Sequence, residues 1–279
     1  MGNVPSATPH KTTDRLRPLA ERASRLRPAE WVMLVAFGLY AFVFPFGVVL
    51  LSFGWMPFGM EWMSSLLLGL LGVACAGWMW TNYGPVGGVV SAAVFALGVA
   101  LEYVGVLTGA PFGRYTYTGV LVPEFPGGVP AAIGFAWLLV VVGGLFTARR
   151  LIGAVRPLAL ALAGAMLAVG LDLLLEPVAF HVKGYWLWAP DPNGYYGIPW
   201  SNFATWLAAS FALNLLAGWL TRWRGPREWT WLPITLYAMN VAMFGTVNLA
   251  HGFWVSGLVA VGLMALVWLG ARRARAIVR

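Results

Sequence analysis

Charged residues are scarce in this sequence. Of its 279 residues, 10% are charged and 60% are hydrophobic, and the mean hydropathy is +0.75. A soluble domain usually has about 25% charged and 45–50% apolar residues. The composition therefore excludes a soluble globular enzyme and a disordered chain.

Cysteine and metal-ligand patterns are also lacking. The single cysteine, Cys75, lies within an apolar run, so it can form neither an intramolecular disulfide nor a cysteine-ligated metal site. The sequence has no glycine-rich phosphate loop after a strand, no Asp-Asp-x-x-Asp motif of magnesium-dependent prenyltransferases and no His/Cys cluster with metal-ligand spacing. We therefore expect no metal and no cofactor.

Long apolar runs predict an all-α protein, a polytopic transmembrane helix bundle of about eight spans. Only helices and closed barrels satisfy every backbone polar group in lipid, and these runs exceed the roughly 10-residue alternating segments of a barrel. Each run is near the roughly 20 residues that cross the hydrocarbon. The expected spans are 31–53, 62–80, 85–107, 129–147, 157–177, 201–221, 231–249 and 252–271.

The basic residues predict the orientation of these spans. With a cytoplasmic N-terminus, all 18 lysines and arginines except Arg114 and Lys183 fall on the cytoplasmic side. The net charge of +8 then reflects membrane topology rather than nucleic-acid binding. We expect a multi-pass protein of the cell (inner) membrane with both termini in the cytoplasm. Its expected parts are a basic leader (1–30), a single transmembrane domain (31–271) and a basic tail (272–279).

Two outer loops resemble each other. Glu102 precedes Tyr115 by thirteen residues, and Asp172 precedes Tyr185 by the same spacing. Each loop ends in a Gly-aliphatic-Pro sequence that starts a new span. The tryptophans seven residues after these prolines are Trp137 and Trp206. The pattern predicts an internal parallel repeat, although chance is the alternative because glycine, tryptophan and valine are abundant.

Three acidic residues fall within the predicted spans: Glu102, Asp172 and Glu176. Ionisable groups at such depth usually face the bundle interior and mark a functional path. Asp172 and Glu176 are four residues apart and share one helical face. Two such acids in a low dielectric cannot both ionise easily, so one is expected to stay protonated and act as a proton donor. The alternative is that each acid pairs with Arg114, Lys183 or a helix N-terminus.

Other polar and aromatic residues are expected at the same membrane face. The topology places Asn202 and His251 at the outer ends of spans, where a hydrogen-bonded turn is the alternative role for His251. Many aromatic residues occupy the two outer loops, either as pocket walls or as interfacial anchors. An apolar cavity with acids and aromatic rings near one face suits a long apolar substrate and chemistry by proton transfer.

Four motifs resemble those of a known family. Residues 102–117 read Glu-x-x-Gly-Val-x-Thr-Gly-x-Pro-Phe-Gly-x-Tyr-x-Tyr, and residues 172–177 read Asp-x-x-x-Glu-Pro. Tyr-Trp-x-Trp at 185–188 and Gly-Ile-Pro-x-x-Asn at 197–202 follow. Over roughly residues 30–270 the sequence resembles the carotenoid biosynthesis proteins of the CruF type, which include gamma-carotene 1′,2′-hydratases and bisanhydrobacterioruberin hydratases.

This resemblance implies a carotenoid 1,2-hydratase, a hydro-lyase that needs no metal or redox cofactor. Such an enzyme adds water to the terminal double bond of an acyclic (psi) carotenoid end group and leaves a tertiary alcohol. The implied partners are the carotenoid in the bilayer, the lipid membrane and other membrane enzymes of the carotenoid pathway. The expected site lies near the non-cytoplasmic face.

We assign roles to the candidate residues on this basis. Asp172 or Glu176 protonates the alkene, and Glu102 with Asn202 steers the attacking water. Aromatic rings stabilise the intermediate cation through their faces. The residues expected to bind the substrate are Phe112, Tyr115, Tyr117, Tyr185, Trp186, Trp200 and His251. The alternatives are a cofactor-free carotenoid or isoprenoid cyclase and a proton-coupled membrane transporter.

Overall fold

The computed structural model describes residues 26–153 and 156–277. Residues 1–25 of the predicted leader and residues 278–279 of the predicted tail lie outside the described residues. The division into leader, transmembrane domain and tail stays a prediction.

Within the described residues, eight helices are long and apolar enough to cross a membrane, and the predicted all-α membrane fold is confirmed. These helices are α2 (Pro28–Phe53), α3 (Trp62–Tyr83), α4 (Pro85–Thr108), α5 (Ala131–Ile152), α6 (Pro157–Pro177), α7 (Trp200–Leu220), α8 (Leu232–Ala250) and α9 (Trp254–Ile277). A π-helical turn, η1 (Val178–Val182), extends α6. Helix α5 continues five residues beyond the expected end of the fourth span at residue 147, through Arg149 and Arg150, whose charges suit a helix C-terminus.

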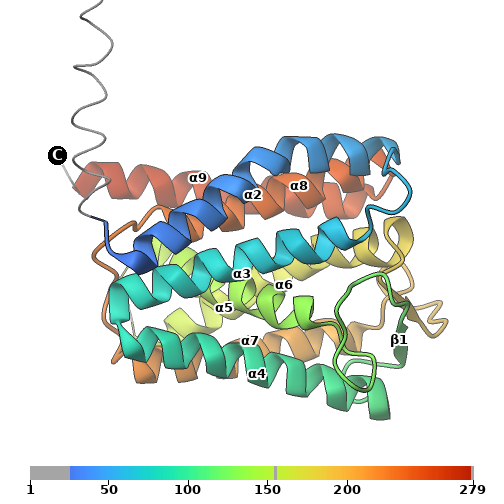
Figure 1. Ribbon diagram of the computed structural model, residues 1–279, viewed down its shortest axis with the longest axis horizontal. Helices are drawn as coiled ribbons and strands as arrows, with labels where there is room; N and C mark the ends of the chain where they lie inside the picture. The colour runs from blue at the N-terminus through green and yellow to red at the C-terminus, as the bar shows by residue number, and fades with distance from the viewer. Residues whose placement is uncertain (1–25, 154–155, 278–279) are drawn as a thin grey trace, which may run out of the picture.

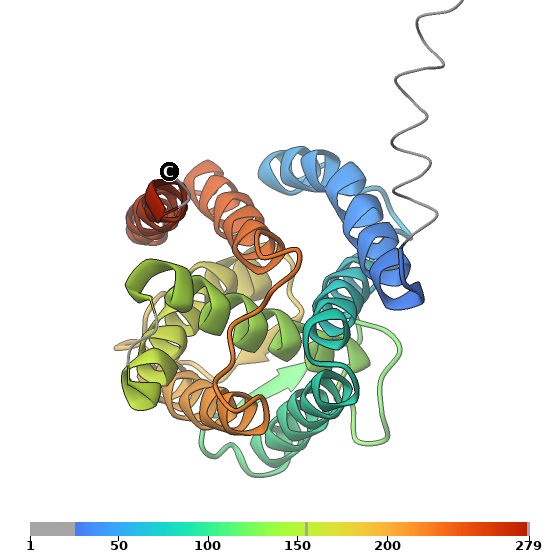
Figure 2. The same ribbon diagram turned by 90° about the vertical axis from the view of Figure 1, so that its left-hand side faces the viewer.

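Helix α5 runs through the middle of the bundle (Figure 2), and 89% of the residues in its most apolar stretch are buried. Small residues let it approach its neighbour α6. A Cβ on Gly144 would lie 2.7 Å from the backbone oxygen of Gly164. Close backbone contact through small residues is the usual basis of helix packing in membranes.

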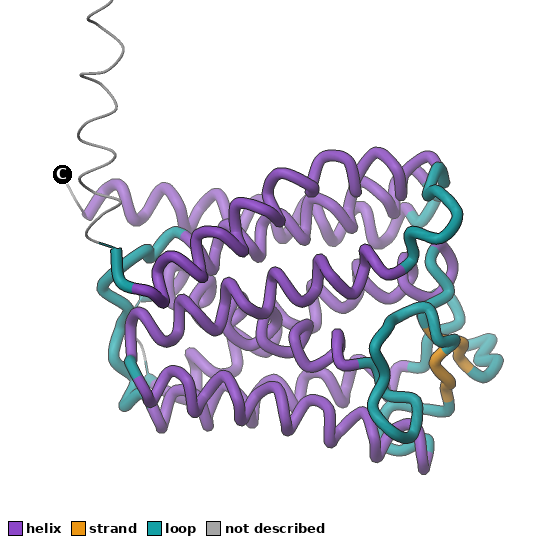
Figure 3. The backbone as a smooth tube through the Cα atoms, viewed as in Figure 1, coloured by secondary structure: helices purple, strands orange, loops and turns teal. Residues whose placement is uncertain are grey.

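The two ends of the bundle differ. At one end, β1 (Tyr115–Tyr117) pairs antiparallel with β2 (Trp186–Trp188), among the loops that follow α4 and α6 (Figures 1 and 3). In this ribbon Tyr115 lies opposite Trp188, and Tyr117 lies opposite Trp186. The described chain begins and ends at the opposite end (Figure 1). We call these the loop end and the basic end.

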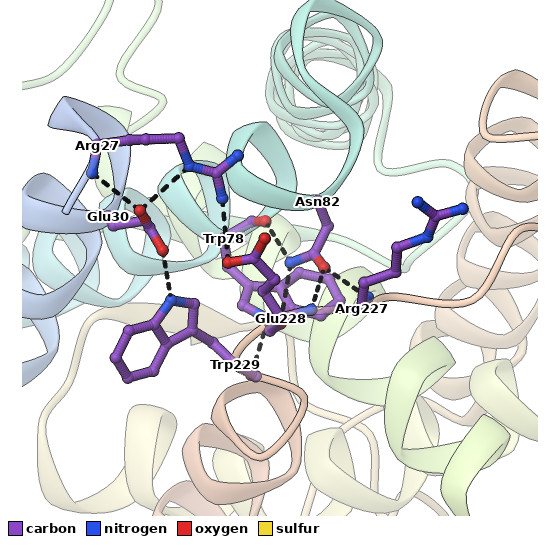
Figure 4. A network of polar contacts seen from close by, with 7 residues as sticks. All are labelled: Arg27, Glu30, Trp78, Asn82, Arg227, Glu228 and Trp229. Atoms are coloured by element: carbon purple, nitrogen blue, oxygen red, sulfur yellow. Dashed lines mark hydrogen bonds and ion pairs between the residues drawn. The ribbon is translucent and has the colours of Figure 1, made fainter. Parts of the chain in front are cut away.

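The basic end is held by a polar network, which we call the basic-end clamp (Figure 4). The Arg27 guanidinium lies 3.1 Å from carboxylate oxygens of both Glu30 and Glu228. The Trp229 indole donates to Glu30 Oε1 at 2.8 Å. The side-chain oxygen of Asn82 accepts from the backbone N–H of Glu228 at 3.0 Å. The clamp thus ties α2 and α3 to the segment before α8.

Candidate functional site

Glu102 lies near the end of α4, where its carboxyl is enclosed by neutral donors. Tyr115 and Tyr117 donate from their hydroxyls to Oε2 at 2.6 and 2.8 Å, and the Trp137 indole donates to Oε1 at 3.4 Å. Burial and the adjacent Glu102 raise the pKa of both tyrosine hydroxyls, so these stay protonated. We call Glu102, Tyr115, Tyr117 and Trp137 the phenol cage.

Glu176 lies near the end of α6 in a second enclosure. The indoles of Trp186 and Trp188 donate to its Oε2 at 3.1 and 3.0 Å, and the Asn202 amide donates to Oε1 at 3.3 Å. Trp186 and Trp188 are alternate residues of β2, so both side chains point to the same face of the ribbon. We call Glu176, Trp186, Trp188 and Asn202 the indole cage.

Asp172 lies one helical turn before Glu176 and is joined to it through Asn202. The Asn202 amide donates to Asp172 Oδ2 at 2.9 Å. Asp172 is buried, and its Oδ1 has no hydrogen-bond partner among the described residues. The two acids thus lie on one helical face, as predicted, and both accept a hydrogen bond from the Asn202 amide.

The alternative that these acids pair with cations is not what the structure shows. Among the described residues, the ion pairs are those of Arg27 with Glu30 and Glu228, at the basic end. Lys183 lies at the loop end with its ammonium group 5.7 Å from the centre of the Tyr185 ring. Partial burial lowers the pKa of Lys183. The three acids are therefore held by neutral donors.

The two similar loops meet at this site. Beyond the pairing of β1 with β2, Trp137 stacks on Trp206, with ring centres 4.5 Å apart and planes 14° apart. Asp172 matches Glu102 in its sequence spacing, but Glu176 is the acid that accepts hydrogen bonds from the β2 tryptophans. The π-helical turn η1 after α6 brings β2 to Glu176 and leaves Tyr185 facing Ser64 of α3.

A cavity of about 270 Å³ joins the two cages, and its walls are mostly apolar. Glu102, Glu176 and Asn202 line it, whereas Asp172 lies behind Asn202. The predicted substrate-binding residues that line it are Phe112, Tyr115, Tyr117, Tyr185 and Trp186. The carboxyl oxygens of both cages can therefore reach one molecule in the cavity.

Two of the predicted substrate-binding residues lie elsewhere. Trp200 is 58% exposed, and its indole donates to the backbone oxygen of Asn193. His251 is exposed and forms a hydrogen bond through Nε2 with the backbone oxygen of Leu51 at 2.9 Å. It joins the outer ends of α8 and α2, as in the hydrogen-bonded turn that was its alternative role.

Several cavity residues were not among the predicted site residues. Trp188 belongs to the indole cage, and Trp137 and Trp206 line the cavity. The sequence did carry a signal for them: Trp188 alternates with Trp186, and the other two follow Gly-aliphatic-Pro by the same spacing. Tyr40 and Asn240 line the cavity from α2 and α8, and no comparable pattern marks them.

Comparison with known proteins gives two matches. The model of the family described as carotenoid biosynthesis protein matches residues 62–267, a stretch that includes both cages. A bisanhydrobacterioruberin hydratase of Haloarcula japonica is 33% identical over 178 residues, which are 60% of this chain and 58% of that protein. The alignment thus spans less than two thirds of the relative's length. No solved structure matches this chain.

Proposed function

This chain belongs to the carotenoid biosynthesis protein family, and we propose that it is a carotenoid hydratase. It adds water to the terminal 1,2 double bond of an acyclic (psi) carotenoid end group and forms a tertiary alcohol. The observation that carries the proposal is that two caged carboxyls, Glu102 and Glu176, face one apolar cavity. The similarity to a protein named as a hydratase supports the reaction type.

In this proposal Glu176 is the proton donor. It lines the cavity, whereas Asp172 does not, and the proposal requires it to carry a proton. Burial without an ion pair to any described cation favours this proton. Indole N–H groups donate but cannot accept. A proton on Glu176 Oε2 therefore finds no acceptor in Trp186 or Trp188. That proton remains available for an alkene carbon.

Transfer of this proton to C2 forms a C–H bond with the π electrons and leaves a tertiary cation at C1. The aromatic rings that line the cavity, such as Tyr117 and Trp186, stabilise the cation. Asp172 is a positioning residue. It accepts a hydrogen bond from the Asn202 amide, which also donates to Glu176 and so orients that carboxyl.

Glu102 is the acceptor for the second half of the reaction. Water attacks C1 through an oxygen lone pair, and Glu102 takes the proton that the water loses. Its partners Tyr115 and Tyr117 are hydroxyls, which can both donate and accept, so the cage accommodates Glu102 with or without a proton. Proton return to Glu176 restores the starting state, and the net change is addition of one water.

We also propose that the site lies near the non-cytoplasmic face of the cell membrane. Arg149 and Arg150 end α5 at the basic end, and a positive cytoplasmic side is the usual arrangement. The cages are at the loop end, on the opposite side. The expected partners are the carotenoid, the surrounding lipid and other membrane enzymes of the pathway.

Expression in a host that makes lycopene or gamma-carotene tests the proposal. The expected result is a more polar pigment whose mass is increased by one water. A cyclase would leave the mass of the pigment unchanged, and a transporter would form no new pigment, so either outcome would overturn the proposal. Host cells that express the Glu176→Gln variant are the control, because this variant has no carboxyl proton at the same position.

A further inference from the structure

Helix α2 is the least enclosed of the membrane helices that the structure describes. Only 11% of the residues in its most apolar stretch are buried, against 33% to 89% for the others. It nevertheless forms one wall of the cavity, through Val43, Phe46, Gly47 and Leu50. A thin wall of one helix therefore separates the cavity from the lipid on this side.

Helices α2 and α3 touch near the basic end and diverge towards the loop end (Figure 1). A Cβ on Gly77 of α3 would lie 3.0 Å from Cβ of Met33, so the helix backbones touch there. A Cβ on Gly47 of α2 would have no atom of the described residues within 4 Å. Figures 1 and 2 show α2 diverging from α3 in this direction, and α2 contains Pro45, which weakens the hydrogen bonding of its turn.

Phe46 marks the place where the cavity meets the outside. It lines the cavity and is also 56% exposed, so one side chain borders both spaces. Across from it, Met63 and Leu67 of α3 line the cavity. We call the part of the cavity wall formed by Phe46, Gly47 and Leu50 of α2 and by Met63 and Leu67 of α3 the α2–α3 opening.

The size of the cavity calls for such an opening. Its volume of about 270 Å³ is below the roughly 300–1,000 Å³ of pockets that enclose a drug-sized ligand. A carotenoid of about forty carbons is larger than such a ligand, so only its end group fits beside Glu102 and Glu176. The rest of the polyene must leave the cavity through apolar surroundings, and the α2–α3 opening provides them.

We propose that the carotenoid enters sideways from the bilayer through the α2–α3 opening and that Gly47 keeps this entrance wide enough for the polyene. The inference rests on the proposed function and adds the route and the residue that controls it. Any side chain at position 47 would project into space that the polyene needs. Gly47 is thus a specificity-determining residue for a long substrate, remote from the reacting carbons.

A graded series at position 47 tests the entrance. Gly47→Ala, Gly47→Leu and Gly47→Phe are assayed for hydration of lycopene in liposomes. We expect near wild-type kcat/KM for alanine, a loss of about tenfold for leucine and a larger loss for phenylalanine, by analogy with the cost of overpacking. Gly38→Phe is the matched control, because Gly38 lies on the same helix, has equally open space around it and is not a cavity residue.

The outcomes separate this inference from the proposed function. Wild-type rates for Gly47→Phe, or equal losses for Gly47→Phe and Gly38→Phe, would overturn the entrance. If the wild-type protein forms no hydrated pigment, the proposed function fails instead. The amount of lycopene that copurifies with each variant then still tests the entrance. We expect at least tenfold less lycopene with Gly47→Phe than with Gly38→Phe. Equal retention would overturn it.

Discussion

Glutamate is buried at both ends of this bundle, and its partners differ between the ends. Glu30 accepts from the Arg27 guanidinium and the Trp229 indole, within the basic-end clamp. In the described part of the chain, Glu102 and Glu176 accept from neutral hydroxyl, indole and amide groups. A carboxylate beside a guanidinium is fixed as an ion, whereas one among neutral donors can take up and release a proton. Partner chemistry, more than burial, separates the structural acid from the candidate reactive ones.

The two cages at the loop end differ from each other as well. The phenol cage contains hydroxyls that can donate or accept, and the indole cage contains N–H groups that only donate. A carboxyl group in the phenol cage can therefore keep its hydrogen bonds whether or not it carries a proton. In the indole cage, the N–H groups can donate to the carboxyl group but cannot accept a hydrogen bond from its proton. This difference is the physical basis for assigning capture of water to Glu102 and release of the proton to Glu176.

Glu176→Gln should have the largest effect. The amide retains acceptor capacity for the indoles but has no ionisable proton, so hydration is expected to fall about 10³-fold or more. The measurement is the yield of hydrated pigment per unit of purified protein. Asp172→Asn is the comparison, with a loss of about tenfold expected, because Asp172 acts through Asn202. Activity of Glu176→Gln within tenfold of wild type contradicts its role as donor.

Glu102→Gln should reduce hydration by about 10²-fold, because water lacks its proton acceptor while the alkene can still be protonated. Heavy water separates this effect from that of Glu176→Gln. In Glu102→Gln the unhydrated carotenoid should gain deuterium, since the cation forms and then loses a proton again. In Glu176→Gln it should not. Mass spectrometry of the recovered carotenoid measures its deuterium content for both variants. If the carotenoid gains no deuterium with either variant, the separate roles of Glu102 and Glu176 are ruled out.

Single donors of the cages should matter less than the acids themselves. Tyr115→Phe removes the 2.6 Å hydrogen bond to Glu102 and is expected to lower kcat about tenfold, since a hydrogen bond to a charged group contributes roughly 1.5–3 kcal/mol. Trp188→Phe removes one of two indole donors to Glu176 Oε2 and should cost less than Tyr115→Phe. A larger loss for Trp188→Phe in steady-state kinetics would reverse this ranking.

Glu30→Gln should have the smallest effect on activity and completes the comparison. It is the same substitution at the basic end, and hydration should stay within about twofold of wild type because the cavity is not altered. The free energy of unfolding should fall by about 1 kcal/mol, since the exposed Arg27 partner is screened by solvent. Thermal unfolding in detergent measures this change. If a folded Glu30→Gln protein shows strongly reduced hydration, Glu30 is not a purely structural acid and the contrast between the two ends fails.

The fold follows closely from the sequence because lipid leaves few choices. Apolar runs of sufficient length must be helices, and the basic residues fix their orientation. The boundaries were less predictable where a helix continues beyond its apolar run, as α5 does through Arg149 and Arg150. Hydropathy alone cannot mark such ends, because arginines in a last turn remain good helix residues.

The site was predictable where residues are close in the chain. The spacing of Glu102 and Tyr115 matches a direct contact in the structure. The equal spacing of Asp172 and Tyr185 does not, because η1 adds a turn that no propensity scale indicates. The position of His251 depends on the packing of α8 against α2, which involves residues about 200 positions apart. Contacts of that kind arise from tertiary structure.

The short ribbon of β1 and β2 has a consequence for how this protein tolerates change. Tyr115, Tyr117, Trp186 and Trp188 all project from one side of it towards the acids, while Leu187 projects from the other side and is 53% exposed. Slipping the pairing by one position would turn two of these rings outward together. A one-residue insertion before either strand would therefore strip an acid of both its ring donors in a single step. The lengths of these two loops constrain the protein more than the identity of any one ring.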